Sequence, residues 1–532
     1  MKQIPQKNRY ISIILKRKQS HTEVYRMILE MKEYRKKLMG CWMGKNIGGT
    51  LGAPFEAKRQ VNDVSFYVQD LAGNPPANDD LDLQLVWLNA VEKYGKNVNA
   101  RILGEYWLSY ITPHWVEYGA GKTNMRMGLV PPLSGYANNP YRDSCGCFIR
   151  SEIWASLAPG HPEIAVKYAY EDAIVDHADE GLYGEIFCAA VESAAFVETD
   201  KYKLIDIGLS YIPEDCGVAK GIKTAIASYQ SGTSWVDARK NVLTAVPGTF
   251  GTLGTPVDQL PKDIPVGERG WDAPSNIAIM IIGWLYGEED FGKSLCIAVN
   301  CGEDTDCTAA TLGSILGIIS GIDGIPQNWI EPMGEKINTL CIDYVDGNVI
   351  LPQNVSELTD RILKAAPIFL GSDLCDFINT SNGYTVSTLE KEALFCKPAV
   401  WNPWKTENFV ESLKQGTFAV KYDFTIFNAA LDYTEEPFIK ANTPKRFKLV
   451  LENNIGRQQW LNVIWHIPEG WKITPAQDMC LYLDHSFIGK TVMEYTLEAE
   501  CLNKSRYDLI VEISSNGRHT KGLIPVVLLH GK

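Results

Sequence analysis

Hydrophobic residues recur at helical spacing through most of the first 370 residues. Helical patterns cover 23–40, 83–94, 101–110, 162–176, 184–196, 275–286, 291–299 and 307–319. Small residues such as Ala189, Ala190 and Gly313 recur inside them, and small side chains allow helices to approach closely. The pattern predicts a compact all-α body.

The sequence pattern changes after about residue 380, where short segments rich in β-branched and aromatic residues alternate with turn residues. Strands are predicted at 418–427, 446–452, 460–466, 491–499, 509–514 and 522–529. They predict an antiparallel β-sandwich of roughly seven strands. The resulting multi-domain α and β division is an extension (1–22), an all-α body (23–375), a linker (376–405) and the β-sandwich (406–532).

A glycine stripe follows the first predicted helix. Gly40, Gly44, Gly48 and Gly52 are four residues apart, so on a helix they form one bare face that suits tight packing against another helix. The segment is not a phosphate-binding loop, because it lacks both GxGxxG and Gly-Lys-Ser/Thr. Glu56 lies just beyond, where the helix end leaves room for a pocket.

Two acidic patches precede apolar helical runs, one at 78–82 and one at 303–306. Acidic residues are favoured in the first turn of a helix, so capping alone explains one such residue per patch. The pairs Asp79–Asp80 and Asp304–Asp306 exceed that need. A hard divalent cation between the two helix starts is the alternative, and both interpretations remain open at this point.

Composition limits the classes of function. The net charge of −13 argues against broad binding to nucleic acid or to an anionic membrane. No apolar run approaches the length of a membrane helix. The 13 cysteines have no framework spacing, which fits a reducing compartment, and the basic N-terminus has too short an apolar core for a signal peptide. A cytoplasmic protein is expected, although a chain already separated from a leader would have the same pattern.

The motifs together resemble the ADP-ribosylglycohydrolase family, which includes dinitrogenase-reductase-activating glycohydrolase and the ADP-ribosyl-acceptor hydrolases. The resemblance covers about residues 35–335. It rests on motifs in the family's order and spacing: the glycine-rich segment ending at Glu56, Asp79–Asp80, 146–150, Asp176–His177, 302–306 and the final Ile325–Pro326.

The resemblance implies an orthogonal all-α fold with one or two Mg²⁺ or Mn²⁺ ions. The implied metal ligands are Asn78, Asp79, Asp80, Asp304, Asp306 and Cys307. Two of these depart from the family pattern, because Asn78 and Cys307 stand where threonines are usual. Asn78 still offers a carbonyl oxygen, whereas Cys307 is a soft ligand that is poorly suited to Mg²⁺.

The resemblance also implies the catalytic and substrate-binding residues. Glu56 is the first choice for the acid/base, and an aspartate of the cluster, Asp80, is the family's alternative. Asp82 is a further alternative, because on a helix it lies near the face of Asp79, but an ordinary first-turn acid explains it equally well. Gly146, Arg150 and His177 match substrate-contacting positions. The competing interpretations are a packed, satisfied histidine for His177 and a simple ion pair with Glu152 for Arg150.

The expected function is metal-dependent hydrolysis of the C1 N- or O-glycosidic bond of ADP-ribose or a related ribofuranosyl group. The substrate would be a small molecule or an ADP-ribosylated acceptor. One alternative is a glycoside hydrolase for another furanoside or sugar, and a second is a non-catalytic binder of ADP-ribose or sugar. Residues 465–471 resemble Ig-like domains appended to carbohydrate-active enzymes, and Tyr422, Trp460, Trp465 and Trp471 are either a sugar-stacking surface or, as favoured here, sandwich core.

Overall fold

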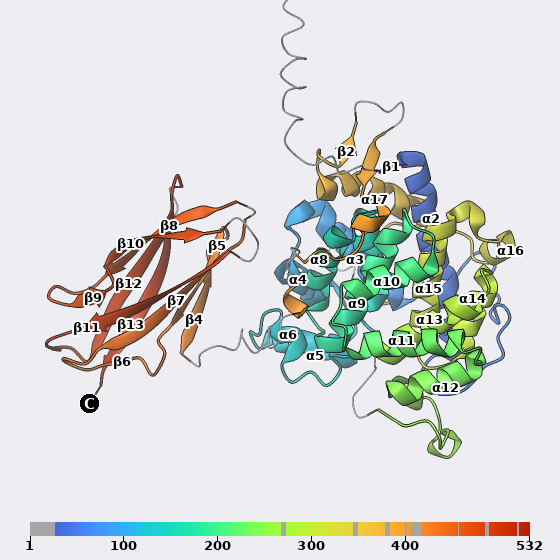
Figure 1. Ribbon diagram of the computed structural model, residues 1–532, viewed down its shortest axis with the longest axis horizontal. Helices are drawn as coiled ribbons and strands as arrows, with labels where there is room; N and C mark the ends of the chain where they lie inside the picture. The colour runs from blue at the N-terminus through green and yellow to red at the C-terminus, as the bar shows by residue number, and fades with distance from the viewer. Residues whose placement is uncertain are drawn as a thin grey trace, which may run out of the picture. The chain divides into compact units, whose positions relative to one another are not determined.

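A computed structural model describes most of the chain as two compact units, which divide between Lys405 and Thr406 (Figure 1). The described residues are 27–267, 273–343, 349–377, 383–398, 402–405, 418–455, 457–484, 489–518 and 521–531. The first unit is a helical body and the second is built from antiparallel β-sheets, which confirms the expected fold class.

The α-helices described for the first unit run from α2 to α17. They are α2 (Met31–Gly52), α3 (Asp79–Tyr94), α4 (Ala100–Tyr110), α5 (Val116–Arg126), α6 (Leu133–Tyr136), α7 (Glu152–Leu157), α8 (Pro162–Ala173), α9 (Asp179–Ala195), α10 (Lys201–Ser210), α11 (Gly217–Gln230), α12 (Trp235–Ala245), α13 (Ala273–Tyr286), α14 (Phe291–Asn300), α15 (Thr305–Ser320), α16 (Gln327–Ile330) and α17 (Val355–Leu370). Helices α9, α13 and α15 are buried over nearly their whole length, so they form the centre of the body. Among the described residues no helix is long and apolar enough to cross a membrane.

The glycine stripe of α2 packs directly on α15, as the four-residue spacing predicts. A Cβ built on Gly44 would lie 2.0 Å from the carbonyl oxygen of Gly313, and one on Gly313 would lie 2.2 Å from that of Gly44. Gly52 meets the backbone of Thr305 in the same way at 2.2 Å. The two backbones therefore touch with no side chain between them, and this contact brings the end of α2 to the start of α15.

A small sheet joins the beginning of the body to residues far along the chain. Strand β1 (Met27–Glu30) pairs antiparallel with β3 (Thr385–Thr388), which also pairs with β2 (Cys375–Asp376). The prediction of a helix over 23–40 is therefore wrong for 27–30. The pairing with β3 supplies strand hydrogen bonds there that local periodicity does not reveal, and the helix begins at Met31.

Much of the segment expected to be a linker contacts the helical body. The carbonyl oxygen of Ser387 is hydrogen-bonded to Nε2 of His161 at 2.7 Å. Nε1 of the buried Trp404 donates to the carbonyl oxygen of Tyr211 at 2.8 Å. These described residues thus belong to the first compact unit.

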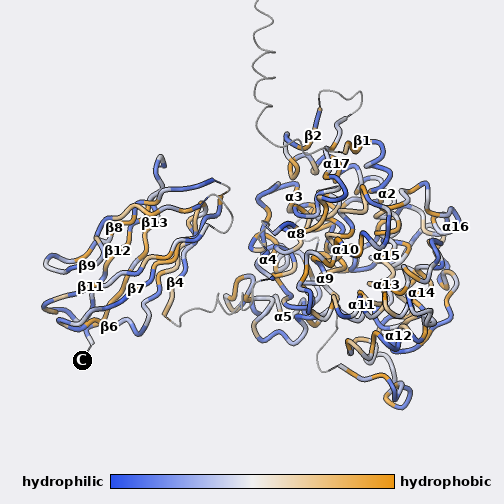
Figure 2. Tube along the Cα trace, viewed as in Figure 1, coloured by the Kyte–Doolittle hydropathy of each residue, from blue (hydrophilic) through white to orange (hydrophobic). Residues whose placement is uncertain are grey.

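The second unit contains two five-stranded sheets packed around one apolar core. The strands are β4 (Ala419–Asp423), β5 (Phe427–Asp432), β6 (Phe438–Ile439), β7 (Lys445–Asn453), β8 (Gln459–His466), β9 (Lys472–Thr474), β10 (Asp478–Leu483), β11 (Lys490–Glu498), β12 (Arg506–Ser515) and β13 (Lys521–His530). Their orders are β10-β8-β12-β13-β6 and β4-β5-β7-β11-β9, and the short β13–β6 pair is the parallel exception. Hydrophobic residues lie along these strands (orange in Figure 2), in keeping with the alternating burial of β7 and β12.

Two details of the β prediction differ from the structure. The expected strand over 418–427 is two strands, β4 and β5, joined by a turn in which Thr425 has φ = 69°. The strands β6, β9 and β10, which no predicted segment covers, raise the number of described strands to ten, above the expected seven. Of the aromatic residues singled out, Trp465 is completely buried in the core, whereas Trp460 is 49% exposed and contacts the ring of Tyr482.

Candidate metal centre

The first acidic patch lies at the start of α3. Asn78 is the N-cap residue, and its Oδ1 accepts a hydrogen bond from the backbone N–H of Asp80 at 2.8 Å. Its Nδ2 lies 3.4 Å from Oδ2 of Asp306, which comes from the other patch. Asn78 therefore caps its own helix and also faces α15.

The second patch lies at the start of α15, where the chain is clamped to the segment after Glu56. The backbone N–H of Ala57 donates to the carbonyl oxygen of Glu303 at 3.0 Å, and the N–H of Glu303 donates to that of Lys58 at 2.9 Å. The buried Glu303 carboxylate accepts from Nε and Nη2 of Arg59 at 2.7 and 2.9 Å. These bonds place Glu56 beside Asp304 and Asp306.

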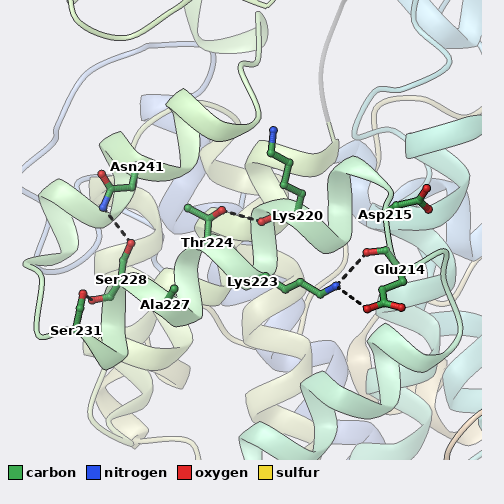
Figure 3. Close-up of a pocket in the computed structure, with 9 residues that line it drawn as sticks. All are labelled: Glu214, Asp215, Lys220, Lys223, Thr224, Ala227, Ser228, Ser231 and Asn241. Atoms are coloured by element: carbon green, nitrogen blue, oxygen red, sulfur yellow. Dashed lines mark hydrogen bonds and ion pairs between the residues drawn. The ribbon is translucent and has the colours of Figure 1, made fainter.

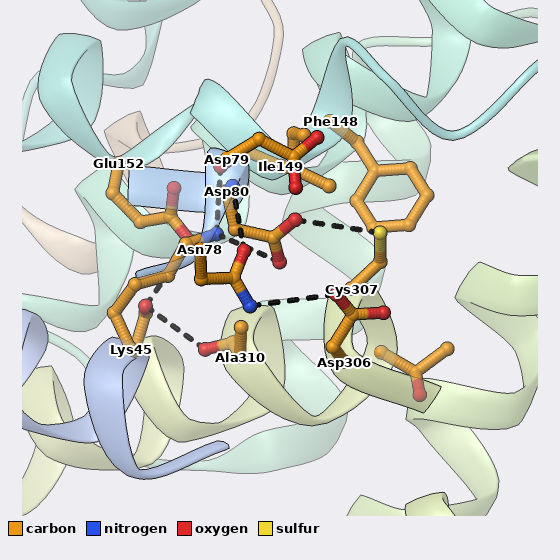
Figure 4. A network of polar contacts seen from close by, with 12 residues as sticks. Lys45, Asn78, Asp79, Asp80, Phe148, Ile149, Glu152, Asp306, Cys307 and Ala310 are labelled. Atoms are coloured by element: carbon orange, nitrogen blue, oxygen red, sulfur yellow. Dashed lines mark hydrogen bonds and ion pairs between the residues drawn. The ribbon is translucent and has the colours of Figure 1, made fainter. Parts of the chain in front are cut away.

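Two groups of potential ligands result, and they share one residue. Asp80, Asp306 and Cys307 form one group, and Glu56, Asp304 and Asp306 form the other. In each group the ligand atoms lie within 4.8 Å of one another. Figure 4 shows Asn78, the N-cap residue of α3, and Asp80 of α3 facing Asp306 and Cys307 of α15.

The carboxylates present oxygen atoms that the described part of the protein leaves without a hydrogen-bond donor. These atoms are Oδ2 of Asp80, Oδ1 of Asp304 and Oδ1 of Asp306, and all are buried. A buried carboxylate oxygen without a partner is costly unless a cation meets it. The donor set therefore fits one or two divalent cations.

The pKa values point to the same need for positive charge. The charge of Asp306 is the largest cause that raises the pKa of Glu56 to about 9, and partial desolvation of its carboxyl group within the cluster and the charge of Asp79 add to it, although the residue as a whole is exposed. Burial and the charge of Asp306 raise the pKa of Asp79 to about 6. Burial raises the pKa values of Asp80 and Asp304 well above the usual range. Without a cation, these carboxylates resist full ionisation in one another's presence.

Lys45 is a neighbour of the centre that sequence reasoning missed. It is a buried lysine on α2, with its Nζ 3.9 Å from Oδ2 of Asp80 and 2.8 Å from Oε1 of Glu152. Gln84 donates to the other oxygen of Glu152 at 2.8 Å. A lysine inside a glycine-rich apolar helix is the signal that could have revealed it, because such a residue is rarely buried unless paired.

Asp79 and Asp82 have further contacts of their own. Tyr118 donates to Oδ2 of Asp79 at 3.1 Å. Oδ2 of Asp82 accepts from the backbone N–H groups of Leu340 and Cys341 at 2.6 and 2.7 Å, and burial raises the pKa of Asp82 to about 7. Asp82 thus anchors the 340–341 segment beside the start of α3, and its Oδ1 has no hydrogen-bond partner among the described residues.

The expected substrate-binding residues lie in a buried polar network. Arg150 donates to Asp172 at 2.8 Å, to Asp176 at 2.5 Å and to the carbonyl oxygen of Gly146 at 2.6 Å. Nδ1 of His177 lies 3.0 Å from Asp176. Arg150 therefore pairs with these two aspartates rather than with Glu152, which is held by Lys45. Substrate contact by Gly146, Arg150 and His177, which are all buried, stays a prediction.

A separate surface hollow of about 730 Å³ lies on α11 and α12 (Figure 3). Its lining includes Lys223, which is paired with Glu214 at 3.8 Å, and Ser228, which accepts from Asn241 at 3.1 Å. None of its lining residues belongs to the two ligand groups.

The helical fold and the shared acidic centre define a class of all-α domain suited to divalent cations. The chain belongs to the ADP-ribosylglycohydrolase family, because that family's sequence model matches residues 30–365 of its 532. Membership implies hydrolase activity, and the match ends before the second unit begins. No match to a curated protein was found.

Proposed function

We propose that this protein is a metal-dependent glycosyl hydrolase that cleaves the C1 N- or O-glycosidic bond of ADP-ribose or a related ribofuranosyl group. The observation that carries the proposal is Asp306, which belongs to both ligand groups and presents a buried oxygen without a donor among the described residues. Mg²⁺ and Mn²⁺ are the proposed ions for the all-carboxylate group, because they prefer oxygen ligands.

The ligand residues proposed here are those predicted from the sequence. Asp79, Asp80, Asp304 and Asp306 would supply carboxylate oxygens, Asn78 a carbonyl oxygen and Cys307 a sulfur, although Asp79 lies outside the two close groups. A bound divalent cation supplies positive charge that polarises the sugar or water oxygen atoms that it holds. The cis-diol of a furanose is a fitting bidentate partner for such a cation.

Glu56 is the proposed acid/base. It lies at the solvent-exposed edge of the centre, whereas Asp80, Asp304 and Asp306 are buried. From there its carboxyl group can give a proton to the leaving group at C1 or take one from the attacking water. The charge of Asp306 is the largest cause of the raised pKa of Glu56. A cation that neutralises Asp306 would therefore lower the pKa of Glu56 toward neutral pH.

Two other residues support this arrangement. Lys45 keeps a positive charge near Asp80, and Tyr118 fixes the orientation of Asp79 by a hydrogen bond. Asp80 and Asp82 remain the alternative acid/base residues. The bonds of Asp82 to the 340–341 backbone favour a positioning role for it.

The test compares the wild type with Glu56→Gln at saturating Mg²⁺ or Mn²⁺. The substrates are ADP-ribose linked to protein, nucleotide or small acceptors, alongside chromogenic furanosides. General acid–base catalysis contributes about 10²–10⁴-fold, so kcat should fall by about that factor. Glu214→Gln, at an exposed glutamate outside the centre, is the matched control and should keep full activity.

Two results would overturn parts of the proposal. Equal rates for the wild type and Glu56→Gln would move the acid/base role to Asp80 or Asp82. Full activity after exhaustive chelation would remove the metal from the proposal.

A second candidate is hydrolysis of a different furanoside or sugar. The exposed pair Trp460 and Tyr482 on adjacent strands of the second unit favours it, because such rings stack on sugars. Turnover of a neutral furanoside with no cleavage of ADP-ribose linkages would select this candidate.

A further inference from the structure

We propose that Cys307 is a metal ligand that makes the two cation positions chemically different. The Asp80–Asp306–Cys307 position would take a thiophilic divalent cation such as Zn²⁺ or Co²⁺, and the Glu56–Asp304–Asp306 position would take Mg²⁺ or Mn²⁺. This inference rests on the proposed function, of which it specifies the metal centre.

The geometry places the sulfur among the ligand oxygens. Cys307 lies in the first turn of α15, and its Sγ is 3.5 Å from Oδ1 of Asp80. Sγ and one oxygen each from Asp80 and Asp306 lie within 4.8 Å of one another. Ligands of one zinc ion stand about 2.0–2.3 Å from it, so three such atoms need only small side-chain rotations to surround it.

A second observation is that two buried carboxylate oxygens of this position have no hydrogen-bond donor among the described residues. Asp80 and Asp306 are only 2% and 5% exposed. Within the described parts of the chain, Oδ2 of Asp80 and Oδ1 of Asp306 accept no hydrogen bond. The cation that pairs with Asp80 is Nζ of Lys45 at 3.9 Å, and that ammonium already bonds Glu152 at 2.8 Å. The oxygens are thus oriented for a further cation.

Ligand chemistry then separates the two positions. A thiolate selects soft or borderline cations such as Zn²⁺ and Co²⁺, and it is a poor ligand for Mg²⁺. The Cys307 thiol donates to Oδ1 of Asp80 here, so on binding a cation it would release that proton to solvent. Three carboxylates, as in the group of Glu56, Asp304 and Asp306, suit hard cations. Asp306 belongs to both groups and would bridge the unlike ions.

The experiment uses full-length protein loaded with one equivalent of Co²⁺ in the presence of Mg²⁺. Cys480 and Cys501 are exposed and would compete for cobalt, so every sample carries Cys480→Ser and Cys501→Ser. The protein with these two substitutions alone is the parent of the variants described below. Loaded with cobalt, it should show sulfur-to-cobalt charge-transfer absorption. Zinc-loaded parent should show one sulfur neighbour at about 2.3 Å by X-ray absorption.

The variants are Cys307→Ser and Cys307→Thr, with Cys296→Ser as the control. Cys296 and Cys307 are similarly buried, at 7% and 8% exposed, and Cys296 lies outside both ligand groups. Both Cys307 variants should lose the charge-transfer band, and their affinity for Zn²⁺ relative to Mn²⁺ should fall at least tenfold. The control should change neither property.

Each outcome decides the inference apart from the proposed function. A cobalt-loaded parent without the band, or a folded Cys307 variant that keeps it, overturns the inference. Zinc absorption data with oxygen and nitrogen neighbours alone also overturn it and require no variant. Metal-dependent hydrolysis alongside either result leaves the proposed function standing, whereas a sulfur-bound metal without hydrolysis supports the inference and refutes the function.

Discussion

At the residue scale, the position of Asp306 in both ligand groups gives it a role that no other acid of the centre has. Asp306→Asn should abolish high-affinity binding at both cation positions, because each loses a charged ligand. Asp304→Asn should remove only the position that includes Glu56. Metal content after dialysis, measured by mass spectrometry, checks the difference.

The comparison requires that both variants remain folded, and their circular dichroism spectra show whether they do. Removing one of several crowded carboxylates relieves repulsion, so neither variant should unfold the metal-free protein. Equal metal loss in the two variants would contradict the sharing of Asp306.

Glu117 provides a separate pH prediction. Burial, more than any nearby charge, raises its pKa to about 8 from an unfolded value near 4.5. A carboxyl group with a raised folded pKa destabilises the folded state as pH rises from its unfolded pKa through its folded pKa. As pH rises from about 5 to 8, the free energy of unfolding of the wild type should therefore fall relative to that of Glu117→Gln. The difference should grow by about 1.4 kcal/mol for each pH unit in that range. Urea unfolding across this range measures the difference, and parallel curves for the two proteins would contradict the assignment.

The residues of the centre were predictable to different extents. The aspartates could be found because they are crowded beyond the needs of capping, and Cys307 could be found because it departs from a family pattern. The partners of Arg150 and Lys45 could not, since the pairs Arg150–Asp172 and Lys45–Glu152 join different helices. Sequence spacing reports neighbours within one helix, whereas these bonds depend on how helices cross.

At the element scale, the contact between α2 and α15 sets the position of the candidate metal centre. Helix α2 leads to Glu56, and α15 begins beside Asp304 and Asp306. Because carbonyl oxygens of one helix fill the space that Cβ atoms would need on the other, the helices have little freedom to slide. The same packing that closes the core thus aligns the ligands.

Gly44→Ala should be strongly destabilising. Replacing a glycine inside a helix by alanine usually stabilises the helix by about 0.5–1 kcal/mol. Here, however, the new Cβ would lie 2.0 Å from the backbone oxygen of Gly313. Overpacking costs about 1–3 kcal/mol, and a backbone obstacle places this case at or above the upper end. The free energy of unfolding and the metal affinity should both fall, as urea titration and calorimetry would show.

Gly104→Ala in α4 is the matched control for that variant. The nearest atom to a Cβ at Gly104 is Sδ of Met125 at 2.9 Å, the flexible end of a side chain that can move aside. The free energy of unfolding of the Gly104→Ala variant should differ from that of the wild type by less than about 1 kcal/mol. Equal losses from the two alanines would show that helix contact is not the cause.

The elements themselves were predictable where periodicity was local. Helix α15 and strands β7 and β8 lie where the patterns place them. The strand β1 was missed because Met27–Glu30 continues an amphipathic pattern, and its partner β3 is far away in the sequence. The prediction failed where pairing between distant segments outweighs local preference.

At the scale of the whole molecule, the two compact units each have their own core. The expected division into an extension, body, linker and sandwich stays a prediction, which we refine by assigning the described residues 383–398 and 402–405 to the body. Residues 1–405 and 406–532, produced separately, should each unfold cooperatively. Calorimetry of both fragments and the full chain checks this, and failure of residues 1–405 to fold alone would refute the refined division.

The strand pair β1–β3 has a consequence for the order in which a ribosome delivers the chain. Strand β1 is among the first described residues to be synthesised, and Thr385–Thr388 follows roughly 350 residues later. At about 5–20 residues per second, β1 waits roughly 20–70 s for its partner. Helix α2 (Met31–Gly52), weakened by its glycines, waits for about 250 residues, or roughly 13–50 s, before α15 begins at Thr305. We therefore expect the candidate ligands of α3 and α15 to stay apart until α15 has been made, and the body to stay open at β1 until Thr385–Thr388 follows.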